Sequence, residues 1–303
     1  MNKPRGVIAP ILTPFEKDGS IARDLWAAHA GWVLEQGAHY LSPFGTTGEA
    51  LSISLRERIQ ALEWLLLAGI PADRLMPGVG VTALAETAEL AAHAIACGAA
   101  AVMVLPSFFY GVAGDEGQAR YFGELIERVA SPALKVILYH IPQNAGVGIS
   151  PALAARLNAD YPETVVAYKD SGGDFVHTQA VIAAAPAISV FPGSESFLTR
   201  GLAAGGAGCI SATVNLNAAA IRAVYDGALK GRDMTAADAA MKAFRKTVQD
   251  AGLIPAMKAV LAVRSGDPRW LNLRAPLIHA TAEQGQALLD RLGDAAAHIR
   301  EAA

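Results

Sequence analysis

The lysine at position 169 has the setting of a reactive amine. Lys169 ends the apolar run 165–168 and precedes the polar segment 170–173. Burial of an ammonium group without a partner favours loss of its proton, and the neutral amine is a nucleophile toward carbonyl carbon. The alternative is a structural ion pair with the neighbouring Asp170. The local sequence leaves both interpretations open.

A second candidate, Tyr139, ends the preceding apolar run of the chain. A phenol donates and accepts hydrogen bonds in one geometry, so beside an amine it suits proton transfer. Tyrosine is also common in strands, and plain packing is the alternative.

The segment Gly45-Thr46-Thr47-Gly48-Glu49 combines flexible backbone with two hydroxyls. Glycines let the backbone approach a ligand, and successive N–H groups favour an anion, so the segment predicts a cradle for a carboxylate or phosphate. An ordinary turn with a threonine helix cap is the alternative. Gly193-Ser194 is a further candidate for an anion site because it follows a predicted strand. The glycine-rich cluster 205–208 instead precedes a strand and indicates a tight turn.

Other motifs argue against cofactor chemistry. Gly78-Val79-Gly80 loosely matches a dinucleotide fingerprint, but no acid follows near residues 98–103 to bind a ribose. The seven histidines show no metal-binding spacing. We therefore predict neither a metal nor an organic cofactor.

The elements that must position these residues alternate in type. Apolar runs typical of buried strands occur at 6–13, 39–44, 75–79, 100–105, 135–141, 165–169, 188–191 and 208–214. Helical spacing separates them, at 24–35, 55–68, 84–96, 117–129, 151–158, 178–185 and 197–204. Strands without clean polar alternation indicate a parallel sheet covered on both faces. A doubly wound open sheet and a closed barrel both satisfy this pattern.

Eight such units within about 215 residues favour the α/β class and a (β/α)8 TIM barrel. We place the barrel at residues 1–215 and a C-terminal helical extension, packed on the barrel, at 216–303. Catalytic residues of such barrels lie at the carboxyl ends of the strands. Lys169 and Tyr139 both occupy that end and, on adjacent strands, should lie within reach of each other.

Composition excludes several classes of protein. The chain has 303 residues, 52% of them hydrophobic and 17% charged, with a net charge of −3, which excludes a disordered chain. Without a basic cluster, we expect no binding to nucleic acid or to membranes. No stretch is long and apolar enough for a membrane span, and no signal peptide is evident, so we expect a cytoplasmic protein.

Taken together, the segment 45–49, Tyr139 with Ile141-Pro142, Lys169 in Tyr-Lys-Asp-Ser, and the segment 208–211 resemble the dihydrodipicolinate synthase and N-acetylneuraminate lyase superfamily. Their order and spacing match over almost the whole chain. The resemblance implies a lyase, a class I pyruvate-dependent aldolase, in which Lys169 forms a Schiff base with a 2-oxo acid.

The same resemblance implies roles for other residues. Tyr139 corresponds to the proton-relay tyrosine, Thr46 and Thr47 to the residues that hold the carboxylate, and Ile210 to a residue whose backbone lines the pyruvate pocket. A tyrosine of a neighbouring subunit, matched here to Tyr110 with Phe108 as the alternative, completes the relay through Thr47. A homo-oligomer, typically a tetramer, is implied as well.

Two departures bear on the substrate. Dihydrodipicolinate synthases carry an arginine where this chain has Asn144, and Asn144 offers no charge to clamp a carboxylate. Sialic acid lyases have serine where this chain has Thr46. We therefore expect cleavage or assembly of a 4-hydroxy-2-oxo acid, of the 2-keto-3-deoxy sugar acid or hydratase-aldolase kind, with small molecules as the partners.

Three alternatives remain open. Within the superfamily, the chain could be a 4-hydroxy-tetrahydrodipicolinate (dihydrodipicolinate) synthase. Outside it, the Gly78 region suggests a dinucleotide-dependent oxidoreductase. A non-catalytic sensor on the same scaffold is the third, although a sensor has no use for an activated amine.

Overall fold

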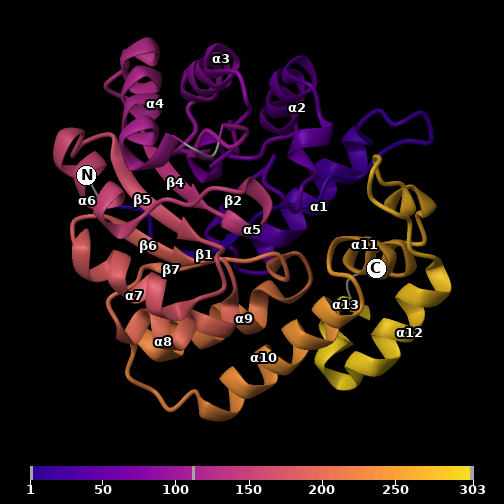
Figure 1. Cartoon of the computed structure of the whole chain (residues 1–303). Coiled ribbons are helices and arrows are strands. Elements are labelled where there is room, and N and C mark those ends of the chain that lie inside the picture. Colours follow the sequence, from indigo (N-terminus) through magenta and orange to yellow (C-terminus); the bar gives the residue numbers. More distant parts are fainter. Residues whose placement is uncertain (1–2, 111–112, 301–303) are drawn as a thin grey trace.

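Short parallel strands form a ring at the centre of the computed structural model, which describes residues 3–110 and 113–300 (Figure 1). Within those ranges the strands are β1 (Gly6–Ala9), β2 (Tyr40–Leu41), β3 (Val102–Val104), β4 (Val136–His140), β5 (Val165–Asp170), β6 (Ser189–Pro192) and β7 (Gly208–Ile210). They pair in the orders β2-β1-β7 and β3-β4-β5-β6.

The run 75–79 closes the gap between these two sheets. Leu75 pairs with Leu41 of β2, and Gly78 pairs with Met103 of β3, each as an isolated parallel bridge. Pro77 lacks an N–H, which prevents a regular ladder. On the other side, the Ala207 N–H donates to the Val190 carbonyl at 2.9 Å and joins β7 to β6. The ring is complete, so the predicted eight-stranded barrel is confirmed, with an irregular third strand.

Helices surround the ring (Figure 1). They are α1 (Arg23–Glu35), α2 (Leu55–Leu67), α3 (Leu84–Ala96), α4 (Gly114–Val129), α6 (Pro151–Asp160), α7 (Phe175–Ala184), α8 (Leu198–Ala203) and α9 (Val214–Leu229). The short α5 (Pro142–Ala145) follows β4 at the carboxyl end of the ring. Local signals set some of the boundaries: Ser54 and Glu57 form a capping box at the start of α2.

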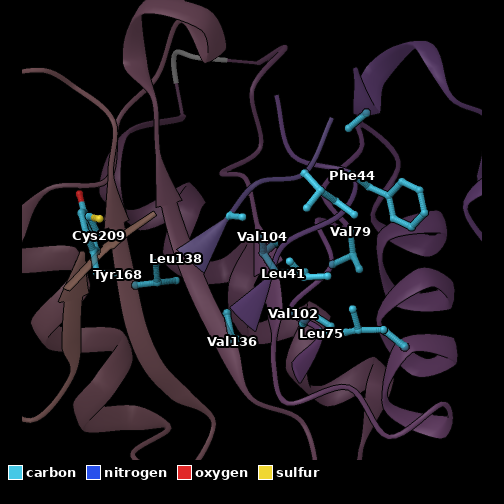
Figure 2. Packing of buried hydrophobic residues seen from close by; sticks show 14 of the residues in the cluster. Leu41, Phe44, Leu75, Val79, Val102, Val104, Val136, Leu138, Tyr168 and Cys209 are labelled. Carbon is cyan, nitrogen blue, oxygen red and sulfur yellow. The ribbon is translucent and has the colours of Figure 1, made fainter. Parts of the chain in front are cut away.

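Successive residues of a strand face different hydrophobic clusters. Along β4, Val136 and Leu138 belong to the large cluster under the outer helices, while Ile137 and Tyr139 belong to the cluster inside the ring. Figure 2 shows part of the outer cluster, including Val102 and both of these β4 residues. Since neither face meets water, the strands are apolar throughout, as the sequence indicated.

The C-terminal extension packs beside one end of the barrel and contains α10 (Thr235–Asp250), α11 (Ile254–Ser265), α12 (Ala282–Leu292) and α13 (Ala297–Arg300) (Figure 1). Its own hydrophobic cluster includes Leu12 and Ala212 of the barrel. The predicted domain boundary at residue 215 lies inside α9. Because α9 contacts β1 and α1, it is the eighth barrel helix, and the extension begins after Leu229.

None of the helices in the described part of the chain combines the length and the apolar character that a bilayer crossing requires.

Candidate active site

Lys169 and Tyr139 face each other inside the barrel mouth. The two residues are register partners on β5 and β4, and each side chain belongs to a residue only 3% exposed. The Lys169 Nζ lies 4.0 Å from the centroid of the Tyr139 ring. Strand alternation explains the meeting, because residues paired on adjacent parallel strands point to the same face of the sheet.

Lys169 makes no ion pair with any residue in the ranges that the structure describes. The neighbouring Asp170 points to the other face of β5, where its carboxylate accepts from the Thr178 hydroxyl at 2.7 Å and from the Gly172 N–H at 2.9 Å. The structural ion pair considered from the sequence is therefore absent between these two residues. Lys169 is therefore a buried lysine without a carboxylate partner among the described residues.

On the outer side of β5, Asp170 lies near His140, whose ring stacks on that of His177. The His140 and His177 rings lie 4.2 Å apart at an interplanar angle of 14°. The His140 Nδ1 accepts from the Ile149 N–H at 3.0 Å, which leaves the proton on Nε2, 3.9 Å from Asp170. Burial lowers the pKa of His140, an effect that Asp170 counteracts. Burial thus favours the neutral imidazole, which packs on the outer side of β4.

The hydroxyl beside Tyr139 is that of Thr46. Thr46 Oγ1 and Tyr139 Oη lie 2.9 Å apart, a distance at which either group can donate. Thr47 is 7% exposed and lines the same cavity as Lys169. The resemblance implied a relay through Thr47, whereas the threonine in contact with the Tyr139 hydroxyl is Thr46.

The segment 45–49 is held in an uncommon backbone conformation. Phe44, the residue before the segment, and Glu49, its last residue, have φ angles of 59° and 58°, in the left-handed region that non-glycine residues seldom adopt. A Cβ on Gly48 would lie 2.7 Å from the Ile11 carbonyl oxygen, so this glycine is needed for packing. The segment runs into a three-residue 3-10 turn, Ala50–Ser52, and the N–H groups of Gly48, Glu49 and Ala50 are bonded to the carbonyls of residues 45 and 46.

These side chains line a cavity of about 650 Å³ at the carboxyl end of the strands. Besides Lys169, Tyr139, Thr46 and Thr47, its walls include the predicted residues Ile210, Gly193 and Asn144. A Cβ on Gly193 would lie 2.2 Å from the Ser171 hydroxyl, so glycine allows the ends of β5 and β6 to approach here. Seven of the eight predicted site residues therefore surround one cavity.

A second cavity of about 390 Å³ adjoins the first and shares Thr46, Tyr139, Ile141 and Asn144 with it. Gly78 and Gly80 lie in its wall. A Cβ at Gly78 would be 2.0 Å from the Phe44 carbonyl oxygen, and one at Gly80 would be 2.7 Å from the Leu105 nitrogen. Close backbone packing thus accounts for both glycines of the loose dinucleotide fingerprint.

The eighth predicted residue, Tyr110, lines neither cavity. It is 72% exposed beside Phe109, which is 77% exposed. Its ring makes an edge contact with that of Phe109, 5.3 Å away. Within one chain, Tyr110 is an outward-facing aromatic residue.

Sequence reasoning missed one charged residue of the main cavity. Arg245 of α10 lines it, donates from Nη1 to the Ser211 hydroxyl at 3.1 Å and lies 3.6 Å from the carboxylate of Glu195. Glu195 is fully buried and also accepts from the hydroxyls of Ser211 and Thr213. An arginine on an amphipathic helix of the extension carries no sequence signal for such a place.

The comparisons with known proteins agree with this geometry. The model of the dihydrodipicolinate synthetase family matches residues 3–294. The chain belongs to this family. A DapA-like lyase of uncharacterised function from Chloroflexus aurantiacus is 35% identical over 95% of this chain and 96% of its own.

Two solved structures show the same fold. The dihydrodipicolinate synthase from Agrobacterium tumefaciens superposes with a TM-score of 0.87 at 29% identity, over 96% of this chain and 100% of its own. A variant of the 2-keto-3-deoxygluconate aldolase from Sulfolobus solfataricus superposes with a TM-score of 0.85 at 20% identity, over 98% of each chain. The resemblance inferred from the motifs is confirmed, and the protein is a lyase of the dihydrodipicolinate synthetase family.

Proposed function

We propose that the protein is a Schiff-base aldolase that cleaves or assembles a 4-hydroxy-2-oxo acid, with pyruvate as the three-carbon partner. The observation that most directly supports this function is that Lys169 is buried beside Tyr139, in one cavity with Thr46 and Thr47. An amine, a phenol and a carboxylate cradle are the groups that imine chemistry on a small keto acid requires.

In the cleavage direction, the Lys169 nitrogen adds to the ketone carbon of the substrate, and water leaves as the protonated imine forms. Tyr139 takes the proton of the 4-hydroxyl group, the bond between carbons 3 and 4 breaks, and the aldehyde departs. The electron pair of that bond enters the imine and gives an enamine. Protonation at carbon and addition of water then release pyruvate and restore the amine.

The residues around this pair have proposed roles as well. Thr46, in hydrogen-bond contact with Tyr139, extends the proton path away from the reacting oxygen. Thr47 and the Ile210 backbone are proposed to receive the carboxylate end of the keto acid. Gly193 lines the same cavity and is proposed as a substrate contact.

For the aldehyde, we propose a neutral, hydroxylated or aromatic molecule. Asn144 offers hydrogen bonds without charge, and the charge of Arg245 is balanced by the nearby buried Glu195. The structural likeness to a 2-keto-3-deoxygluconate aldolase is compatible with this substrate class.

The second candidate is 4-hydroxy-tetrahydrodipicolinate synthase. A relative with that name from Synechococcus is 31% identical over 86% of this chain and 82% of its own. Asn144 is the observation against it, because the arginine of that enzyme's motif is missing. Direct comparison of aspartate semialdehyde with sugar-derived aldehydes separates the two functions.

We further propose a homo-oligomer, typically a tetramer, in which Tyr110 of one subunit reaches the Thr46–Tyr139 pair of another. The exposure of Phe109 and Tyr110 in the single chain supports this arrangement. The cytoplasmic location stays a prediction from the sequence.

Trapping tests the Schiff base directly. Incubation with pyruvate and borohydride should add a reduced three-carbon adduct to the peptide that contains Lys169, and Lys169→Met should remove it. Absence of the adduct in the wild-type protein would refute the proposed function. A screen of pyruvate release from candidate keto acids then identifies the substrate.

A further inference from the structure

A buried ion pair joins the last residue of the segment 45–49 to the C-terminal extension. The Lys258 Nζ of α11 donates to Glu49 Oε1 at 2.7 Å, and both side chains are 1% exposed. Glu49 is the last residue of the segment that carries Thr46 and Thr47, whereas Lys258 belongs to the C-terminal extension. The pair therefore connects the extension to the wall of the main cavity.

Further hydrogen bonds fix both partners. The Lys258 Nζ also donates to the Thr13 carbonyl at 2.8 Å and lies 4.6 Å from the centroid of the Phe15 ring. The second oxygen of Glu49 accepts from the Arg274 N–H at 2.9 Å. Three distant parts of the chain, the segment after β1, the segment 45–49 and the extension, thus converge on one carboxylate and one ammonium group.

The segment itself provides the reason for such a clamp. Glu49 and Phe44 both have left-handed backbone conformations, which persist only where the surroundings hold them. The Thr13 hydroxyl donates to the Gly48 carbonyl at 2.8 Å, so Thr13 contacts both the segment and Lys258. Release of Glu49 would remove a side-chain restraint on the segment that carries Thr46 and Thr47.

Stability alone does not require an ion pair here. Replacement of a buried ion pair by well-packed apolar side chains is often neutral or stabilising, while removal of one partner is strongly destabilising. What the pair adds over an apolar contact is direction, because Glu49 must point toward both the Lys258 Nζ and the Arg274 N–H.

We propose that Lys258 is a positioning residue that acts through Glu49 to hold Thr46 against Tyr139 and Thr47 in the cavity. The catalytic consequence rests on the proposed aldolase function. The structural consequence, that the segment 45–49 is held in place, does not depend on the proposed function.

The test compares Lys258→Met, Glu49→Gln and the double variant E49Q/K258M near neutral pH, since burial lowers the pKa of Lys258 to about 8. The double variant removes both charges and keeps an acceptor for the Arg274 N–H. The control is R222Q/D226N, which removes the ion pair of 2.8 Å on α9, away from the cavity. Measurements are the melting temperature, kcat, KM and amide hydrogen exchange at Gly48, Glu49 and Ala50.

In the double variant we expect a folded protein whose kcat falls on the order of 10²-fold, as misplacement by about 1 Å can cause. Exchange at the three amides, which are bonded to the Gly45 and Thr46 carbonyls, should accelerate at least about tenfold relative to the control. A folded double variant with wild-type kcat and unchanged exchange would overturn the proposal. If the double variant fails to fold, Glu49→Gln alone must show the faster exchange.

These outcomes remain distinct from failure of the proposed function. A wild-type protein that traps no pyruvate adduct refutes the aldolase proposal. The exchange rates in the variants would still decide whether Lys258 and Glu49 hold the segment.

Discussion

The Nζ of Lys169 lies over the ring of Tyr139, 4.0 Å from its centroid, while the hydroxyl at the far end of that ring lies 2.9 Å from Thr46. The Tyr139 side chain therefore has Lys169 against the face of its ring and Thr46 beside its hydroxyl. A substrate imine formed on Lys169 would extend along the ring toward the hydroxyl. This order is the basis for our proposal that the covalent step and the proton transfer belong to different residues.

Replacement of Tyr139 by phenylalanine tests that division. The ring contact with Lys169 remains, but the hydroxyl is lost. We expect kcat for pyruvate release to fall by about 10²- to 10⁴-fold, the usual contribution of a general acid–base group, while borohydride still traps pyruvate on Lys169. An unchanged kcat would exclude Tyr139 from proton transfer. The measurement combines steady-state kinetics with mass spectrometry of the trapped peptide.

The two threonines should have separable effects. Thr46→Val removes the partner of the Tyr139 hydroxyl and should lower kcat by roughly tenfold or more, with little change in KM. Thr47→Val should instead raise KM for the keto acid by about five- to 100-fold, because a hydrogen bond to its carboxylate is lost. The opposite pattern would return the relay to Thr47.

Tyr110 can be tested by mixing two inactive variants. If it completes the site of a neighbouring subunit, Tyr110→Phe and Lys169→Met should each be nearly inactive, and mixed oligomers should recover activity. Recovery follows because some sites combine an intact lysine with an intact tyrosine. No recovery after verified subunit exchange would contradict the assignment, and Phe108→Leu then tests the alternative.

Asn144 offers a gain-of-function test of specificity. Asn144→Arg introduces a planar cation at the wall shared by both cavities and should raise kcat/KM for aspartate semialdehyde by about tenfold or more through a bidentate contact. Asn144→Lys is the matched control, since it adds the same charge without the planar guanidinium group that binds a carboxylate through two hydrogen bonds. If wild-type protein already prefers the semialdehyde to neutral aldehydes, our substrate assignment is wrong.

His29 should make the fold sensitive to acid. Its Nε2 lies 2.9 Å from the Asn215 side-chain oxygen, and burial lowers its pKa to about 4. Between pH 6.5 and 4 the unfolded chain binds this proton and the folded chain does not, so stability falls as the pH falls, by about 3 kcal/mol from this group. Urea unfolding across this range should show a shallower loss in His29→Gln; equal slopes would contradict the prediction.

The sequence by itself determined the barrel and most of its site. Strand length, two-sided apolar patterning and the βα alternation follow from local residue types, and they placed Lys169 and Tyr139 at the same end of adjacent strands. The family motifs located Thr46, Thr47 and Ile210, a departure from one motif drew attention to Asn144, and its place after a strand made Gly193 a candidate. All five line one cavity.

Only the tertiary structure decided which groups meet. Which of the two threonines contacts Tyr139 depends on the backbone conformation of the segment 45–49. Phe44 before the segment and Glu49 at its end are left-handed, and residue types do not specify that conformation. The contacts of Lys258 and Arg245 depend on how the extension packs. Lys258 lies 209 residues from its partner Glu49, and Arg245 lies 34 residues from its partner Ser211. Helical periodicity shows that these helices have a buried face. It carries no information about which buried partner that face will find, because the packing of distant segments makes that choice.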